Sequence, residues 1–240
     1  MRLFLPKESF SQELITIADR KIVHYVTRVM RKNSGDDFVA LDNSGNEFSA
    51  TISHIDRQSV QATINHSKKN TAEPKIFTTL YQALPKKMSL FEMVLQKCTE
   101  IGVSRFVPII TERTERHEIN NTARLLEIMK EASEQCGRGK IPVLECPFLL
   151  SSAFKLDTGK AKFFADSSGE KIPLLLPRAP MEQTELTTFS LYIGPEGGFT
   201  EKEIEMAQKN TATIVSLGPR TMRTETAAIL LSGIVHMAIE

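Results

Sequence analysis

The 240-residue chain has no tryptophan, three cysteines and a net charge of only +1. The cysteines, Cys98, Cys136 and Cys146, form no C-x-x-C pair, which argues against a disulfide framework or a structural zinc site and indicates a reducing compartment. The low net charge means that any surface for a nucleic acid has to be a local patch. The sequence also has no metal-ligand spacing and no Ser-His-Asp order, so we expect no metal and no nucleophilic triad.

Long apolar runs are missing as well. No segment approaches the roughly 18 apolar residues of a membrane-spanning helix. The first residues, MRLFLPKESF, lack the apolar run of a signal peptide. We therefore expect a cytoplasmic protein with no membrane partner. Hydrophobic residues make up 41% of the chain, which is ordinary for a globular protein with a sizeable core.

Residues 1–70 read as a series of short strands. The stretch FVALDNSGNEFSATI predicts a hairpin around the turn Asn43-Ser44-Gly45-Asn46. One helix, at residues 19–31, interrupts the strands, with Asp19 or Thr16 as its cap. Many short strands with one helix predict a small barrel-like domain. The polar stretch NHSKKNTAEPK, residues 65–75, is the best candidate for a linker.

Residues 75–240 have a different predicted order of elements, because strands alternate with helices. Apolar strands such as KIFTTLYQAL, RFVPII, TTFSLYIG and TIVSL are separated by segments with helical periodicity, including residues 86–101 and the terminal TETAAILLSGIVHMAIE. This alternation predicts an α/β domain with a mostly parallel sheet covered on both faces.

The stretch IGPEGGFTEKEIE, residues 193–205, follows a strand and precedes a helix that Thr200 and Glu203 cap as a capping box. Ligands of open α/β sheets bind at such strand ends. The spacing fits neither G-x-G-x-x-G nor G-x-x-x-x-G-K-[ST], which excludes the common nucleotide loops. The carboxylate of Glu196 would repel a phosphate but suits a cationic or neutral ligand. A plain strand-to-helix turn is the alternative.

A second loop of this kind, SLGPRTMRTETAA at residues 216–228, also follows a strand and opens a helix. It carries Arg220, Arg223 and Glu225. Taken alone, Gly218-Pro219 is an ordinary turn with solvated arginines beside it. Beside the first loop it would form the second wall of one pocket, and we predict that pocket.

Basic residues gather in two further places. The predicted helix at residues 19–31 has one apolar stripe, Ile22, Val26 and Val29, while His24, Arg28 and Arg31 repeat the same spacing on the outward face. A basic face in a small β domain suits RNA phosphates, although a solvated helix face is the alternative.

Lys86 and Lys87 follow Pro85 in the predicted first turn of the next helix. Cations there oppose the helix dipole, which favours a role outside the helix, such as phosphate contact. An ordinary exposed pair is the alternative. Three arginines lie among glutamates and are predicted to form ion pairs within the chain: Arg113, Arg116 and Arg138.

Five segments in order resemble the bacterial small-subunit ribosomal RNA methyltransferases that make N3-methyluridine: HYVTRVMR, KKMSLFEMVLQKCTEIGV, EQCGRGKIP, IGPEGGFTEKE and LGPRTMRTETAA. This family belongs to the SPOUT class of knotted methyltransferases. The resemblance implies a C-terminal SPOUT trefoil-knot α/β domain over residues 75–240, preceded by a small PUA-like β-barrel domain over residues 1–70. The knot follows from the resemblance alone. Met30 and Met222 stand where the family favours Leu or Ile.

The resemblance further implies an S-adenosylmethionine-dependent enzyme that methylates N3 of a specific uridine in 16S ribosomal RNA within the 30S particle. It implies a homodimer formed through the knotted domain. By the same resemblance the RNA-binding residues are His24, Arg28 and Arg31. Lys86 and Lys87 are added as RNA-binding residues because of their position at the start of the predicted helix. The implied cofactor residues are Gly194, Pro195, Glu196, Gly197, Gly198, Leu217, Gly218, Met222, Arg223, Thr224 and Ala227.

The chemistry of the proposed cofactor agrees with the loop. S-adenosylmethionine carries a sulfonium cation and no phosphate, so a carboxylate at residue 196 is no obstacle. Because uridine N3 must lose a proton to become a good nucleophile, we hypothesise that Glu196 or Glu225 removes it while Arg223 stabilises the anion. Two alternatives stay open: a methyltransferase acting on the ribose 2′-hydroxyl, and a non-catalytic RNA-binding assembly factor.

Overall fold

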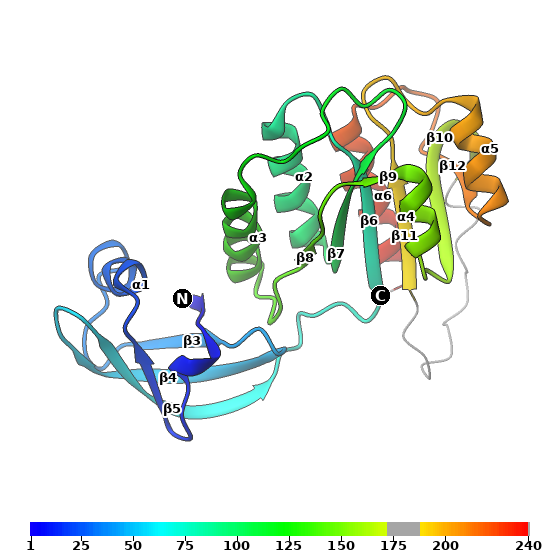
Figure 1. The fold of residues 1–240 in the computed structure, drawn as a ribbon. Coiled ribbons are helices and arrows are strands. Elements are labelled where there is room, and N and C mark those ends of the chain that lie inside the picture. Colours follow the sequence, from blue (N-terminus) through cyan, green and yellow to red (C-terminus); the bar gives the residue numbers. More distant parts are fainter. Residues whose placement is uncertain (172–187, 240) are drawn as a thin grey trace. The chain divides into compact units, whose positions relative to one another are not determined.

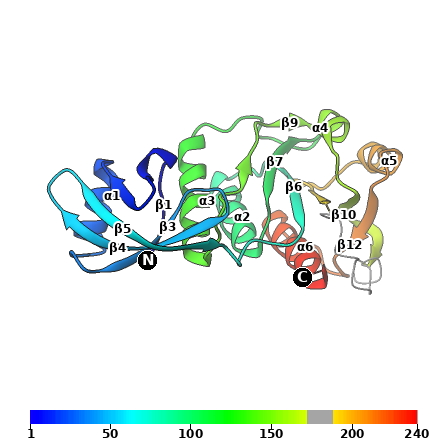
Figure 2. The same cartoon turned by 90° about the horizontal axis from the view of Figure 1, so that it is seen from below.

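The computed structural model describes residues 1–171 and 188–239, and the chain divides into two compact units. The first, here called the N-terminal unit, holds residues 1–73 and 133–141, and the second, the sheet unit, holds residues 74–132 and 142–240. Figures 1 and 2 show the elements of each unit. No helix within the two described ranges is long and apolar enough to cross a membrane.

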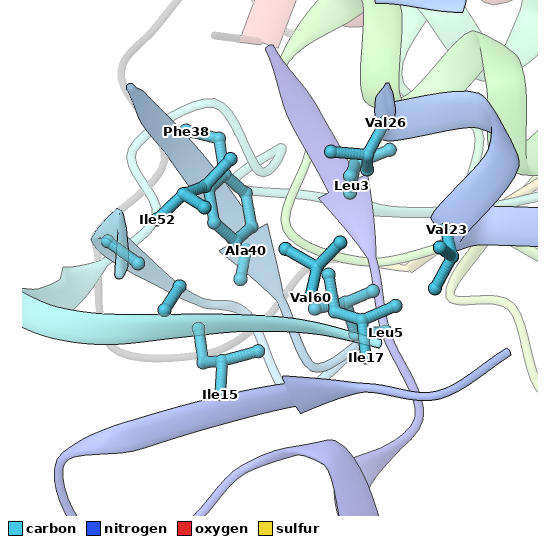
Figure 3. Packing of buried hydrophobic residues seen from close by; sticks show 12 residues of the cluster. Leu3, Leu5, Ile15, Ile17, Val23, Val26, Phe38, Ala40, Ile52 and Val60 are labelled. Atoms are coloured by element: carbon cyan, nitrogen blue, oxygen red, sulfur yellow. The ribbon is translucent and has the colours of Figure 1, made fainter. Parts of the chain in front are cut away.

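The N-terminal unit is built on a five-stranded sheet with the strand order β1-β3-β4-β5-β2. Its β1 runs parallel to β3, and the other neighbours are antiparallel. Inward-facing aliphatic side chains such as Leu3, Ile17 and Val60 pack into one core (Figure 3). The strands are β1 (Arg2–Phe4), β2 (Leu14–Ile17), β3 (Asp37–Leu41), β4 (Asn46–Ile55) and β5 (Val60–Lys69). The predicted hairpin of residues 37–55 is therefore confirmed.

The segment predicted as a linker is in part a strand. β5 continues to Lys69, which pairs with Asn46 of β4. The outer half of β5 is exposed, so it lacks the apolar alternation by which strands are recognised in a sequence. Backbone pairing extends the ladder there, and Lys68 forms an ion pair with Glu47 of β4 at 3.0 Å. The linker prediction is thus wrong for residues 65–69.

The predicted helix at residues 19–31 is two short pieces rather than one α-helix. α1 (Arg20–His24) begins at Asp19, whose side chain accepts the N–H groups of Lys21 and Ile22, and a π-helical turn, η2 (Tyr25–Val29), follows it. The wider π turn rotates every later side chain relative to an α-helix. Val29 is consequently 57% exposed rather than part of an apolar stripe. Arg31 lies beyond the helix with φ +51°, so it does not extend the face of His24 and Arg28.

A short segment distant in sequence completes the N-terminal unit. Residues 133–141 end helix α3 (Thr122–Cys136) and continue past it. Glu134 Oε1 accepts the N–H of Phe4 at 2.8 Å, and the side-chain amide of Asn70 donates to the Gly137 carbonyl at 2.8 Å. Arg138 forms an ion pair with Glu73 at 3.3 Å, as its surroundings of glutamates predicted.

The sheet unit contains a parallel sheet with the strand order β12-β10-β11-β6-β7-β8, and β9 also pairs with β7. The predicted mostly parallel sheet is confirmed. Its strands are β6 (Phe77–Ala83), β7 (Arg105–Ile110), β8 (Val143–Leu144), β9 (Phe148–Leu149), β10 (Ala161–Lys171), β11 (Thr188–Ile193) and β12 (Thr213–Ser216). Its other helices are α2 (Met88–Ile101), α4 (Leu150–Leu156), α5 (Glu201–Lys209) and α6 (Thr224–Ile239).

Helices cover both faces of this sheet, with α2 and α6 on one face and α4 and α5 on the other (Figure 2). An aromatic layer that includes Tyr81, Phe164 and Tyr192 lies under α4 and α5. α6 follows the edge strand β12 in sequence but packs on β11 and β6 in the middle of the sheet. Because β12, β10 and β11 are parallel neighbours, their carboxyl ends meet at one edge, where ligands of such sheets bind.

Candidate functional site

A cavity of about 280 Å³ lies at this edge of the sheet unit. The loops that follow β11 and β12 form two of its walls, and the carboxyl half of β10 forms the third. Both predicted glycine loops therefore line one pocket. From the first loop the lining residues are Gly194, Pro195, Glu196, Gly197, Gly198 and Phe199, and from the second they are Leu217, Gly218, Arg220, Thr221, Met222, Thr224 and Ala227.

The first loop takes its shape from its glycines and from Phe199. A side chain at Gly194 would meet the Phe199 ring at 3.0 Å, and Gly198 has φ +68°. Phe199 is buried and packs against Phe164 in a tilted arrangement with ring centroids 3.9 Å apart, which fixes the end of the loop to the core. The predicted capping box follows at once, because Thr200 and Glu203 exchange side-chain to backbone hydrogen bonds at the start of α5. The loop therefore brings its glycine backbone to the cavity together with residues such as Glu196.

One hydroxyl group joins the two glycine loops. The buried Thr224, first residue of α6, donates to the Gly194 carbonyl at 2.6 Å. It accepts at 2.8 Å from the side-chain amide of Gln82, which is fully buried at the end of β6 and also donates to the Ala83 carbonyl. The second loop is thus held to the first loop and to the central strand.

The third wall was not predicted from the sequence. β10 pairs with β12 through Ala165 and again from Glu170, and the four residues between them bulge out of the ladder. Asp166 lines the cavity, and its carboxylate accepts the N–H and the hydroxyl of Ser168 at 2.9 and 2.7 Å. A side chain at Gly169 would overlap the backbone of Ile214, so only glycine allows this bulge to pack. The available signal was the turn-rich stretch Asp-Ser-Ser-Gly directly after an apolar strand.

The charges on the cavity wall are mixed. Among its described lining residues are two carboxylates, Asp166 and Glu196, and one guanidinium, Arg220. A phosphate ligand would meet two like charges here, whereas a ligand with a positive centre and hydroxyl groups would find acceptors and a close backbone. The cavity therefore suits a small cationic or zwitterionic ligand.

The cavity's first loop is supported from outside by the segment after β7. Arg113 Nη1 donates to the carbonyls of Gly197 at 2.8 Å and Phe199 at 3.3 Å. Arg116 donates to the Lys86 carbonyl, and the Lys86 N–H donates to Glu196 Oε1 at 3.0 Å. The prediction that Arg113 and Arg116 form ion pairs with glutamates is therefore wrong, because both bind backbone carbonyls instead.

Comparison with known proteins agrees with this geometry. Residues 72–236 match the family model of the RNA methyltransferase domain, and residues 17–65 match that of the RNA methyltransferase PUA domain. Ribosomal RNA small subunit methyltransferase E of Synechocystis is 30% identical to the chain, covering 100% of it and 78% of the relative. The chain belongs to the ribosomal RNA small subunit methyltransferase E family.

Solved structures show the same fold. A methyltransferase from Legionella pneumophila, determined with bound SAM, is 30% identical with a TM-score of 0.85 and covers 99% of this chain and 97% of its own. The Neisseria gonorrhoeae methyltransferase E bound to S-adenosyl methionine is 26% identical with a TM-score of 0.87 over the same shares. The predicted fold class, a PUA-like domain followed by a SPOUT α/β domain, is confirmed.

In this methyltransferase E family member, the three predicted catalytic residues lie in different surroundings. Glu196 is exposed on the cavity wall. Arg223 is exposed and belongs to the second loop, but it is absent from the wall. Glu225 is buried in the first turn of α6, away from the wall, and its Oε2 has no hydrogen-bond partner among the described residues. Only one of the three is thus brought to the cavity.

The N-terminal unit has a separate, basic groove of about 960 Å³. His24 and Arg28 line it as a pair, and Lys32 takes the place predicted for Arg31. Further basic residues come from Arg20, His54 and Arg57. The groove holds one acid, Asp56, whose pKa is lowered because its carboxylate accepts hydrogen bonds from the Gln58 N–H and from the hydroxyl and N–H of Ser59.

Lys86 and Lys87 precede α2 rather than forming its first turn, because Lys87 is the N-cap residue. Both are exposed. The Lys86 ammonium forms an ion pair with Glu115 at 2.8 Å, and this contact raises the pKa of Lys86. Lys86 also borders a polar hollow of about 470 Å³, together with residues 115–118 and 120.

Proposed function

We propose that this chain transfers the methyl group of S-adenosylmethionine to N3 of a specific uridine in 16S ribosomal RNA, within the assembled small subunit. The observation that carries this proposal is the three-walled cavity, in which two glycine loops and two carboxylates meet at the ends of parallel strands. That substrate places the enzyme in the cytoplasm.

The cavity fits S-adenosylmethionine in size and in charge. Its volume of about 280 Å³ is near the lower end of the usual range for small-molecule sites. The residues proposed to hold the cofactor are Gly194, Pro195, Glu196, Gly197, Gly198, Leu217, Gly218, Met222, Arg223, Thr224 and Ala227, to which the structure adds Asp166 and Arg220 as candidates. The cofactor supplies an electrophilic methyl group on a sulfonium, and the chain supplies position and electrostatics.

The target nitrogen sets two further requirements. N3–H of uridine is engaged in a base pair within a duplex, so the substrate base has to be unpaired or flipped out. N3 also has to lose its proton. We propose Glu196 as the first candidate for the proton acceptor because it lies on the cavity wall, with Glu225 as the second and Arg223 as the group that stabilises the anion.

RNA is proposed to bind the basic groove of the N-terminal unit through His24 and Arg28, with Arg31 at its margin. Lys86 and Lys87 would add contacts on the sheet unit. We further propose a homodimer formed through the sheet unit. Two exposed methionines, Met93 at 44% on α2 and Met237 at 88% on α6, lie on helices that pack together and would give apolar contacts to a second copy. The double substitution Met93→Glu with Met237→Glu is expected to yield monomers in sedimentation experiments.

Transfer of labelled methyl groups to purified small ribosomal subunits, followed by nucleoside analysis, tests the proposal. Label on N3-methyluridine is the expected result. Label on ribose would favour the 2′-hydroxyl alternative, and absence of S-adenosylmethionine binding in calorimetry would favour the non-catalytic assembly factor. Near-normal single-turnover rates in both Glu196→Gln and Glu225→Gln, with cofactor binding intact, would refute a carboxylate base.

A further inference from the structure

The segment that follows β7, residues 111–116, is attached to the first glycine loop by a set of hydrogen bonds that the chemistry above does not use. Glu203, buried at the start of α5, accepts the Glu112 N–H at 2.8 Å with Oε1. The Thr200 hydroxyl donates to Glu112 Oε2 at 3.2 Å. Glu112 alone therefore attaches this segment to the end of the loop, in addition to the contacts that Arg113 makes.

Arg113 makes the closest connection to the loop itself. Its Nη1 donates to two carbonyls, Gly197 at 2.8 Å and Phe199 at 3.3 Å, which lie on either side of Gly198. Gly198 has φ +68°, a conformation that holds the loop's turn. A single guanidinium thus bridges the turn from outside. A charged donor gives each carbonyl a stronger hydrogen bond than a neutral donor would.

The aliphatic part of Arg113 also lies against the loop. A Cβ at Gly197 would stand 3.4 Å from Arg113 Cδ and 3.5 Å from its Cβ. No ion pair neutralises Arg113 in the described part of the chain. Its charge therefore serves carbonyl groups on a loop whose opposite side lines the cavity.

We propose that Arg113 is a positioning residue for methyl transfer, which holds the Gly197–Phe199 turn in the conformation that binds S-adenosylmethionine. This inference rests on the proposed function of the same cavity. Without the bridge the loop samples other conformations, and the apparent cofactor affinity falls in proportion to the fraction that remains competent to bind. Methyl transfer at saturating cofactor is nearly unchanged, because the bound state restores the loop.

Replacement of Arg113 by Ala and by Lys in the full chain tests the inference. For Arg113→Ala we expect the S-adenosylmethionine Kd from calorimetry and the KM to rise about tenfold, the loss expected from one charge-assisted hydrogen bond. We expect kcat at saturating cofactor to stay within about threefold and the unfolding temperature to stay unchanged. Arg113→Lys keeps one charged donor and is expected to restore part of the affinity. The matched control is Arg124→Ala, an exposed arginine of α3 whose side chain makes no described hydrogen bond or ion pair.

A second measurement uses the contact between the arginine stem and the loop. Gly197→Ala presses on Arg113 Cδ in the native protein, whereas in the Arg113→Ala background that atom is gone. The effects of the two substitutions on cofactor Kd are therefore expected to be non-additive. Additive effects would contradict the proposed contact.

Other outcomes overturn the inference. An unchanged cofactor Kd in Arg113→Ala rejects it. A parallel fall of unfolding temperature and affinity indicates a merely structural role, and weaker RNA binding with unchanged cofactor Kd indicates a phosphate contact instead. If the native chain itself fails to bind S-adenosylmethionine or to methylate RNA, the proposed function fails. If the native chain is active and Arg113→Ala has an unchanged cofactor Kd, only the inference about Arg113 is refuted and the proposed function stands.

Discussion

The candidate sites of the two units are lined by different kinds of groups. The groove of the N-terminal unit is lined by long charged side chains on α1, η2 and a turn. The cavity of the sheet unit has four glycines among its described lining residues and three charged side chains, Asp166, Glu196 and Arg220. A side chain on a stable scaffold can be replaced without altering its neighbours. A wall formed by backbone is altered only when the conformation of the chain itself is altered. Single substitutions should therefore have graded effects in the groove and large effects in the cavity.

The largest effect is expected where a backbone wall tolerates no side chain. Gly169→Ala places a Cβ onto the backbone of Ile214, which cannot move without breaking the pairing of β10 with β12. We expect the free energy of unfolding to fall by about 3 kcal/mol and cofactor binding to be lost.

Thermal unfolding and calorimetry measure both quantities for Gly169→Ala. Gly233→Ala is the matched control, because a Cβ there meets nothing within 4 Å and the residue lies inside α6. A well-folded Gly169→Ala variant that binds the cofactor normally would contradict the expectation that substitutions in the cavity wall have large effects.

A smaller effect is expected when the link between the loops is cut without a change in volume. Thr224→Val removes the hydroxyl that joins Gly194 and Gln82 and leaves buried polar atoms short of a partner. We expect the cofactor Kd to rise about tenfold, since such a loss costs roughly 1–3 kcal/mol. The neighbouring exposed Thr226→Val is the control, and calorimetry is the measurement. Equal behaviour of the two variants would show that the hydroxyl link is dispensable.

Removing single charges from the groove should weaken RNA binding by graded amounts and leave cofactor binding unchanged. Arg28→Ala is expected to weaken RNA binding roughly fivefold and to reduce the slope of log K against log salt by about 0.7 to 1, the value for one phosphate contact. Lys32→Ala should behave alike, because Lys32 also lines the groove. Arg31→Ala is expected to have a smaller effect and serves as the comparison, because Arg31 does not line the groove. Fluorescence titrations at several salt concentrations measure these effects, and a larger loss in Arg31→Ala would favour the helical face predicted from the sequence.

The smallest effect is expected at the turn that carries Asp56. Its pKa is lowered because the charged carboxylate accepts hydrogen bonds from Gln58 and Ser59, so its stabilising contribution is present above the unfolded pKa and is lost as the pH falls through the folded pKa. Asp56→Asn should lower the unfolding temperature by on the order of 2 °C between pH 5 and 8. The difference from the native chain should shrink as the pH falls below the unfolded pKa and through the lowered folded pKa. A difference that instead grows on acidification would contradict this sign.

Local patterns were enough to predict much of this architecture. Alternating strands and helices indicated the parallel sheet, and the capping box at Thr200 placed the first glycine loop at the start of a helix. Both glycine loops then fell at the ends of β11 and β12, the two strands that flank β10 in the sheet. These features depend on residues close together in sequence, and periodicity and turn chemistry report on such residues directly.

The features that escaped prediction depend on contacts distant in sequence. Asp166 reaches the cavity because β10 leaves its ladder with β12, and a single strand pattern does not reveal such a bulge. Arg31 does not share a helix face with His24 and Arg28 because a π turn changes the spacing within η2. Arg113 binds the carbonyls of Gly197 and Phe199, which are 84 and 86 residues away in sequence, rather than nearby glutamates. Each case turned on geometry that only the folded chain defines.

The N-terminal unit is discontinuous, and this affects the order in which the protein can be made. Its last piece, residues 133–141, is translated after the first two strands of the sheet unit. While the chain emerges from the ribosome, the N-terminal unit has to wait, lacking the partners of Phe4 and Asn70, until residue 141 has left the exit tunnel. Domains otherwise fold one after another during synthesis. Here the later half of the chain must supply the closing piece of the earlier one, so a simple cut near residue 74 would leave the N-terminal unit without residues 133–141.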